Sequence, residues 1–213
     1  MITTFGSQLG LSESECEFVG LTRVINTKSI GSQHMCRIKP SVGTTGAGLT
    51  RSDCICIIGF LYILPEGSPL YIDPDSNDID QLESRLADIR ATYGDDIPIV
   101  LLGDFNARVG SNEDYLIEND DDADYLPLPD LYTPDCFDEP RATEDGVTNK
   151  FGLALLEICK LWGMHIVNGR KLGDERGCVT CITHNGSSLV DYILASTNCF
   201  SNILDMTVHS RPD

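Results

Sequence analysis

The sequence predicts an α/β fold, in which strands and helices interleave and helices cover packed sheets. Two observations support this prediction. Apolar, β-branched runs at 54–62 and 97–102 flank one helical pattern, and a second helical pattern covers 151–162. Three short strand-like runs then follow, joined by glycine-containing turns, at 164–167, 178–183 and 189–195. With 213 residues, 41% of them hydrophobic, the chain can bury one substantial core.

The first helix is predicted between the two long apolar runs. Its apolar residues recur at spacings of three and four and therefore share one face: Ile79, Leu82, Leu86 and Ile89. Ser76 or Asn77 is expected to cap its first turn, and Gly94 to end it. The run at 97–102 is then a buried strand, with Pro98 near its start, where a strand tolerates proline. The second helix, over 151–162, is expected to turn Leu155, Leu156 and Cys159 inward and to end at Gly163.

The N-terminal region carries little pattern. Residues 1–50 predict no helix, and they lack the basic start and apolar stretch of a secretory signal. The longest apolar run, 54–64, has 11 residues, well short of the roughly 20 that a membrane-spanning helix needs. Nine cysteines, an odd number in a chain without an export signal, favour reduced thiols. We therefore expect an intracellular protein of the nucleus or cytoplasm, neither secreted nor bound to a membrane.

One pair of cysteines has the spacing of a metal motif. Cys178 and Cys181 form a Cys-x-x-Cys, and His184 follows three residues later. Structural zinc usually needs a second pair of ligands at suitable spacing, and the sequence offers none. In the predicted strand, side chains three apart also point to opposite faces. Two ordinary thiols are the expectation, and a zinc site is the alternative.

An acidic segment dominates the charge of the chain. Residues 113–145 hold 13 Asp and Glu side chains against one base, Arg141, so they supply −12 of the formal net charge of −18. Four prolines exclude long helices there, so we predict a solvated, loop-rich excursion, with a cation-binding tract as the alternative. Because phosphate neutralisation by basic residues supplies most nucleic-acid affinity, this composition argues against tight DNA binding.

The most informative stretch is 101–110, with the sequence LLGDFNARVG. A buried strand delivers Asp104 and Asn106, two residues apart, to its carboxyl end, where α/β sheets commonly carry ligand chemistry. A carboxylate can accept a proton or face a cation, while a neutral amide donates a hydrogen bond without adding charge. The pair suits metal-assisted hydrolysis. Taken alone, the same residues also suit an Asx-turn that only shapes the loop.

These residues carry a resemblance to a known family. Gly103-Asp104-Phe105-Asn106-Ala107, followed at the right distance by the segment 188–196 (SLVDYILAS), resembles the signatures of the endonuclease/exonuclease/phosphatase family. The segment 61–68 resembles the family's Tyr-x-Pro-Pro motif, with Leu64 where a proline is usual. The segments 149–159 and 166–169 are similar to the endonuclease domain of LINE-type, non-LTR retrotransposons. The resemblance covers roughly residues 54–213.

The resemblance implies a fold, a reaction and a site. The fold is a DNase I-like, four-layer α/β/β/α sandwich of two packed mixed sheets flanked by helices, incomplete at both ends, over 51–213. The reaction is phosphodiester hydrolysis with Mg²⁺ or Mn²⁺ as cofactor and DNA as the ancestral partner. Asp104, Asn106 and Asp191 are the implied metal and catalytic residues, and Tyr62 is the implied phosphate contact. Asp104 would orient or deprotonate the attacking water, Asn106 would hydrogen-bond water or phosphate, and Asp191 would pair with a catalytic histidine. Asn168 is expected to be structural.

Two elements of the family pattern are not recognisable. No Gln-Glu pair ends an early apolar strand, and the nearest glutamates lie in a polar run: Glu13, Glu15 and Glu17. The family closes with an Asp-His pair, whereas His209 follows Val208. The sequence therefore predicts a truncated domain whose activity is in doubt. Two alternatives stay open: a phosphoinositide or sphingomyelin head group as substrate, or an inactive remnant that serves as a binding module. The sequence makes no prediction of oligomeric state.

Overall fold

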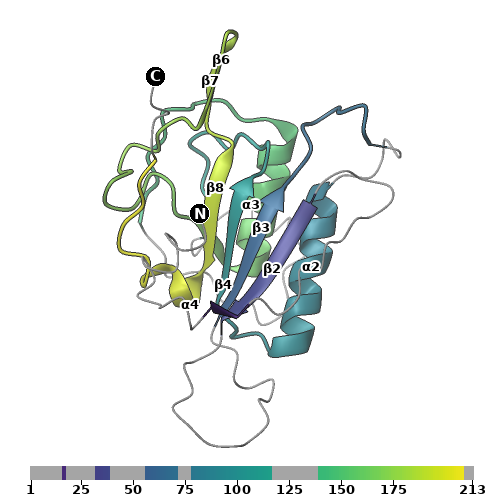
Figure 1. Cartoon of the computed structure of the whole chain (residues 1–213). Helices are drawn as coiled ribbons and strands as arrows, with labels where there is room; N and C mark the ends of the chain where they lie inside the picture. Colours follow the sequence, from purple (N-terminus) through teal and green to yellow (C-terminus); the bar gives the residue numbers. More distant parts are fainter. Residues whose placement is uncertain (1–15, 18–31, 39–55, 72–77, 117–138, 209–213) are drawn as a thin grey trace, which may run out of the picture.

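The computed structural model describes residues 16–17, 32–38, 56–71, 78–116 and 139–208. Its centre is a six-stranded mixed sheet of order β1-β2-β3-β4-β8-β5 (Figure 1). Its strands are β1 (Cys16–Glu17), β2 (Ser32–Ile38), β3 (Cys56–Tyr62), β4 (Ile99–Asp104), β8 (Asp191–Ser196) and β5 (Met164–Ile166). Only β3 and β4 are parallel neighbours; every other described pair is antiparallel.

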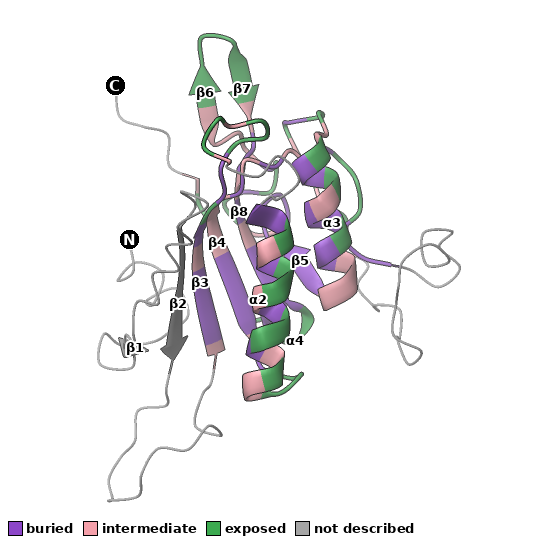
Figure 2. Cartoon of the chain, turned by 90° about the vertical axis from the view of Figure 1, so that its right-hand side faces the viewer, coloured by how far each residue is buried: buried purple, intermediate pink, exposed green. Residues whose placement is uncertain are grey.

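Helices cover one face of this sheet. Helix α2 (Asp78–Tyr93) is the crossover that parallel neighbours such as β3 and β4 require, and α3 (Lys150–Trp162) lies beside it (Figure 2). The short helix α4 (Thr197–Phe200) follows β8 at the end of the sheet. The main hydrophobic core lies between the two long helices and the sheet, and it includes Leu86, Leu101 and Leu155. No helix in the described part of the chain is long and apolar enough to cross a membrane.

Both long helices were predicted from their apolar spacing, and both predictions are confirmed. The apolar stripe of α2 is buried, and the helix ends just before Gly94, whose φ is 98°. The predicted caps of α2, Ser76 and Asn77, lie outside the described residues. Helix α3 begins after Asn149, whose side chain accepts a hydrogen bond from Gly152 N, and ends at Gly163 in the left-handed region, with φ 56°.

The strands differ from the predictions at their ends. Strand β4 continues to Asp104, so this residue is the last of the strand and does not follow it. Strand β8 begins at Asp191, two residues later than expected, because side chains take the place of a neighbouring strand before it. Leu189 N donates to Asp145 Oδ2 at 3.0 Å, and Val190 N donates to Thr180 Oγ1 at 3.3 Å. The predicted strand 178–183 is also shorter and covers only Cys181–Thr183; Cys178 N donates to Asp174 Oδ1 at 2.8 Å and not to a neighbouring strand.

The second face of the sheet carries no second sheet among the described elements. The strands outside the main sheet are β6 (Cys181–Thr183) and β7 (Gly186–Ser188), which form a hairpin that projects from one end (Figure 2). A smaller hydrophobic cluster covers part of this face: Val100, Val167, Ala195, Cys199, Phe200, Ile203 and Met206. Part of the poorly patterned N-terminal region lies in the main sheet, because β2 pairs with β3 along its whole length.

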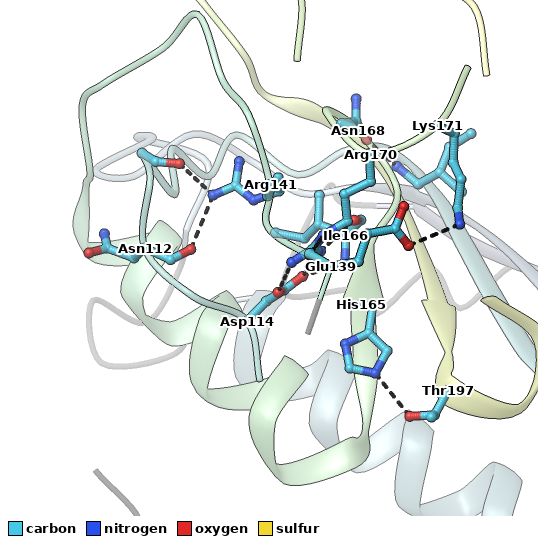
Figure 3. Close-up of polar contacts among 12 residues, drawn as sticks. Asn112, Asp114, Glu139, Arg141, His165, Ile166, Asn168, Arg170, Lys171 and Thr197 are labelled. Carbon is cyan, nitrogen blue, oxygen red and sulfur yellow. Dashed lines mark hydrogen bonds and ion pairs between the residues drawn. The ribbon is translucent and has the colours of Figure 1, made fainter. Parts of the chain in front are cut away.

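Two carboxylates at the described ends of the acidic segment are buried, and for these the prediction of a solvated loop is wrong, whereas Glu113 and Glu144 are exposed as expected. Asp114 is 0% exposed and Asp145 is 5% exposed. Each carboxylate has an arginine partner, since Asp114 pairs with Arg170 (Figure 3) and Asp145 pairs with Arg108. A count of charges along the chain does not reveal partners that lie far away in sequence. Residues 117–138 of this segment lie outside the described part.

Candidate functional site

Three of the predicted site residues lie side by side across the sheet. Tyr62 ends β3, Asp104 ends β4 and Asp191 begins β8. In the register of the sheet, Tyr62 is the partner of Asp104, and Asp104 is the partner of Asp191. Asp104 and Asp191 face each other in an antiparallel pair, in which opposite residues have Cβ atoms about 4.5–5.5 Å apart and share a face, and Tyr62 is in register with Asp104 on the parallel neighbour β3. We call these three residues the carboxylate row.

The carboxylate row occupies the face of the sheet that α2 and α3 leave open. Leu101 belongs to the core under the helices, and side chains alternate between faces along β4, so Asp104 projects to the opposite side. Asp104 and Asp191 are half-buried, and Tyr62 is 40% exposed. The row therefore combines two partly desolvated carboxylates with a phenol that solvent can reach.

Glycine is required directly before Asp104. Gly103 has φ 145°, and a Cβ atom at this position would lie 1.9 Å from the carbonyl oxygen of Leu61. Any side chain here would force β3 and β4 apart. This close approach explains the glycine of the Gly-Asp-Phe-Asn motif, and it holds the end of β3 beside Asp104.

The turn after Asp104 is held by Asp104 itself and by Asn106. Asp104 Oδ1 accepts a hydrogen bond from Asn106 N at 2.9 Å, which is the Asx-turn that the residue types alone allowed. Asn106 has φ 48°, in the left-handed region, and its Nδ2 donates to Ile63 O at 2.8 Å. Asn149 Nδ2 donates in turn to Asn106 O at 3.3 Å. Asn106 thus has a structural contact, and none of the described residues hydrogen-bonds to its Oδ1.

The surroundings of Asp104 disfavour the ionised form of its carboxyl group. Burial raises its pKa, and the nearby Asp191 carboxylate raises it further, while the hydrogen bond from the Asn106 N–H works in the opposite direction. The repulsion between two neighbouring carboxylates of this kind is reduced when they share a proton or bind a cation. Magnesium prefers oxygen ligands and is commonly held by one or two carboxylates, with water and substrate phosphate completing its shell. The oxygen-rich row fits such an ion.

Within the described residues, the row is a two-carboxylate site. No group of three or more His, Cys, Asp or Glu side chains with metal-binding geometry occurs in that part of the chain. The glutamates of the N-terminal polar run, at positions 13, 15 and 17, lie outside the described residues or have side chains that are not described. Cys178 and Cys181 are both free thiols.

None of the hydrogen bonds and ion pairs in the described part of the chain joins a histidine side chain to Asp191. His165 is the register partner of Ala195, four residues along β8 from Asp191, and its Nε2 lies 3.0 Å from Thr197 Oγ1 (Figure 3). His184 is exposed in the turn between β6 and β7. The side chain of His34 is not described, and His209 lies outside the described residues.

Two residues that the sequence did not mark as functional contact the backbone of Asp191. Thr180 Oγ1 accepts a hydrogen bond from Asp191 N at 3.1 Å, and Asn168 Nδ2 donates to Asp191 O at 3.2 Å. Asn168 was expected to be structural, and Thr180 was one residue of a predicted strand. A threonine shortly before the SLVDY segment carries no local signal of this contact, because the β6–β7 hairpin separates the two residues in sequence.

A hollow of about 400 Å³ borders Asp191 on the same face of the sheet. Most of its walls are apolar: Phe60, Leu102, Ile193, Met206 and Val208. The hollow can therefore hold a ligand beside the carboxylate row. The Asp191 carboxylate lies at one end of it.

Comparison with known proteins agrees with the motif. The family model described as "Endonuclease/Exonuclease/phosphatase family" matches residues 22–202. The match begins before β2 and ends after β8, so it includes the whole carboxylate row. A search of curated proteins finds no match.

Proposed function

Because this chain belongs to the endonuclease/exonuclease/phosphatase family, we propose that it hydrolyses phosphodiester bonds with Mg²⁺ or Mn²⁺ at the carboxylate row. The observation that supports this proposal is the shared register of Tyr62, Asp104 and Asp191 on neighbouring strands. The Gly-Asp-Phe-Asn motif and the segment 188–196, which are distant in sequence, thereby meet at the ends of two neighbouring strands. A purely structural role for either motif does not require this meeting. The four-layer α/β/β/α architecture belongs to the same proposal.

Each residue of the site has a proposed role. Asp104 and Asp191 supply carboxylate oxygens for the metal ion, with Asn106 Oδ1 as a neutral third oxygen. The bound ion would neutralise charge on the scissile phosphate. Asp104, whose pKa is raised by burial and by Asp191, orients the attacking water and accepts its proton. Tyr62, exposed at the other end of the row, donates its phenolic O–H to a phosphate oxygen.

The substrate class follows from two opposing features. The segments 149–159 and 166–169 favour descent from a LINE-type retrotransposon endonuclease, and hence DNA as the ancestral substrate. The formal net charge of −18 disfavours tight DNA binding, because a polyanion must approach an acidic surface. We therefore expect any DNA cleavage to be weak and strongly dependent on salt. Phosphoinositide and sphingomyelin head groups are the competing phosphodiester substrates.

A plasmid-nicking assay tests the proposal. The wild-type chain should nick DNA with Mg²⁺ or Mn²⁺ and lose this activity in EDTA. Asp104→Asn and Asp191→Asn should each lower the rate by about 100-fold or more. Asp88→Asn is the matched control, since the Asp88 side chain is 72% exposed on α2 and belongs to no site. Nicking that persists in EDTA or in Asp104→Asn would refute the site.

The alternative is an inactive remnant that acts as a binding module. It is favoured by the absence of a histidine beside Asp191 in the described part of the chain. A folded wild-type protein that binds no Mn²⁺ and cleaves neither DNA nor the two lipid head groups would support this alternative.

A further inference from the structure

Strand β8 loses its neighbour β5 before it reaches Asp191. The pairing of the two strands runs from Met164–Ser196 to Ile166–Leu194, and Val167 N still donates to Ile193 O at 2.8 Å. The chain then leaves the sheet through a turn in which Arg170 N donates to Val167 O. The edge of β8 from Ile193 back to Asp191 therefore has no strand of this sheet beside it.

The side chain of Asn168 replaces the missing strand. Its Oδ1 accepts a hydrogen bond from Ile193 N at 3.0 Å, and its Nδ2 donates to Asp191 O at 3.2 Å. One carboxamide thus presents the acceptor and the donor that a peptide group of a paired strand would present. Asn168 is 0% exposed, so water cannot substitute for either contact.

The same short stretch is held from a second direction. Thr180 Oγ1 accepts from Asp191 N at 3.1 Å, so side chains bind both the N–H and the C=O of Asp191. On its other edge, β8 pairs with β4, where Asp191 faces Asp104. The position of the Asp191 carboxylate therefore depends on a backbone that Asn168 and Thr180 keep in place.

We propose that Asn168 is a positioning residue that holds Asp191 opposite Asp104 and thereby sets the spacing of the carboxylate row. This inference rests on the proposed function for its effect on metal binding, but its geometric part stands without it. Without the Asn168 amide, Ile193 N and Asp191 O have no partner in the interior, and the start of β8 separates from its neighbours. Outer partners of metal ligands typically change metal affinity or activity by about 10- to 100-fold when they are replaced.

The test compares two isosteric variants with a control on the same strand. Asn168→Leu removes both hydrogen bonds with little change in volume, and Thr180→Val removes the acceptor of Asp191 N at a half-buried position. Ser196→Ala is the control, because Ser196 Oγ accepts from Ile99 N at 2.9 Å at the far end of β8. All three variants lose buried or partly buried hydrogen bonds, but only the first two lose them at Asp191.

Two measurements separate positioning from general stability. The Mn²⁺ dissociation constant of the full chain, measured by electron paramagnetic resonance, should rise about 10-fold or more in Asn168→Leu and stay within about two-fold in Ser196→Ala. In the metal-free chain, the cross-strand nuclear Overhauser effect between backbone protons of Asp104 and Asp191 should be lost in Asn168→Leu and kept in Ser196→Ala. The nicking assay adds a third readout beside these two: in Asn168→Leu, kcat should fall while the KM for DNA changes little.

The outcomes distinguish this inference from the proposed function. Unchanged Mn²⁺ affinity together with an intact Asp104–Asp191 contact in Asn168→Leu would overturn the inference. A wild-type chain that binds no Mn²⁺ would overturn the proposed function, and the Asp104–Asp191 contact would then decide the role of Asn168. If Asn168→Leu does not fold, the same two measurements on Thr180→Val decide: an intact contact there would count against the inference, and a lost contact would support it.

Discussion

Replacing Asp114 by alanine should remove the carboxylate that pairs with Arg170 in the interior. The Asp114 and Arg170 side chains are both 0% exposed, with Arg170 Nη1 at 2.7 Å from Asp114 Oδ2 (Figure 3). A second, parallel bond joins Arg170 Nη2 to Asp114 Oδ1 at 2.7 Å, and Ile166 N donates to Asp114 Oδ2 at 2.6 Å. The guanidinium also donates to the carbonyl oxygens of Ile166 and Glu139. The pair therefore joins the start of the acidic segment to β5.

The expected cost follows from this geometry. Asp114→Ala removes the counterion of Arg170 and the acceptor of Ile166 N, and breaking a buried pair from one side typically costs about 3–5 kcal/mol. Whole domains have stabilities of about 5–15 kcal/mol, so this loss approaches the limit for folding. Burial by itself raises the pKa of Asp114, but the hydrogen bonds and charge of Arg170 lower it below its usual 3.8. The contribution is therefore present above pH 3.8 and is lost as the pH falls through the lowered pKa.

Urea unfolding of a double-mutant cycle measures this effect. The cycle contains wild type, Asp114→Leu, Arg170→Met and the double variant, with Asp114→Ala measured beside it. Each single change should lower the free energy of unfolding by about 3–5 kcal/mol, and the double variant should recover most of this loss, because no charge remains buried. Asp88→Ala, which breaks the exposed pair with Arg85, is the control and should cost less than about 1 kcal/mol. An Asp114→Ala cost below about 1 kcal/mol, or additive single effects in the cycle, would refute this reasoning.

Two further predictions concern His165 and Asn149. Burial lowers the pKa of His165 from 6.5 to about 4. Between pH 6.5 and pH 4, His165 is therefore mostly protonated in the unfolded chain and mostly neutral in the folded chain. Stability should therefore fall by about 3 kcal/mol as the pH drops from 6.5 to 4, in addition to other titrating groups. Urea midpoints across this range should depend less on pH in His165→Gln, and an unchanged dependence would contradict this assignment. Asn149 Oδ1 accepts from Gly152 N at 2.7 Å and from Arg108 N at 2.9 Å, so Asn149→Ala should cost about 1–2 kcal/mol. Asn149→Ser should restore part of this loss, and thermal unfolding that is equal for Asn149→Ala and wild type would exclude the capping role.

Local patterns predicted the helices and the strand that carries the first motif. The spacing of Leu82 and Leu86 identifies the buried face of α2, and Gly163 marks the end of α3, because both signals act within a few residues. The strand ends were less predictable. Leu189 and Val190 are apolar enough for a strand, but their N–H groups bond to the side chains of Asp145 and Thr180. Such competition between side chains and strands depends on residues outside the strand itself, here 44 positions away for Asp145 and 10 positions away for Thr180.

The order of the amino acids by itself determined where apolar faces, caps and tight turns form, and it brought Asp104 and Asn106 to the end of one strand. Only the tertiary structure decided that β8 lies between β4 and β5, and in which register. This arrangement places Asp191 opposite Asp104 and buries Asp114 against Arg170. It also leaves the backbone of Asp191 at a strand edge, where the Asn168 side chain hydrogen-bonds to it. The physical reason is that strand pairing and buried polar contacts gain their energy between residues that are distant in sequence: Asp104 and Asp191 are 87 positions apart, Asp114 and Arg170 are 56 apart, and Asn168 and Asp191 are 23 apart. No short window of the sequence contains both partners.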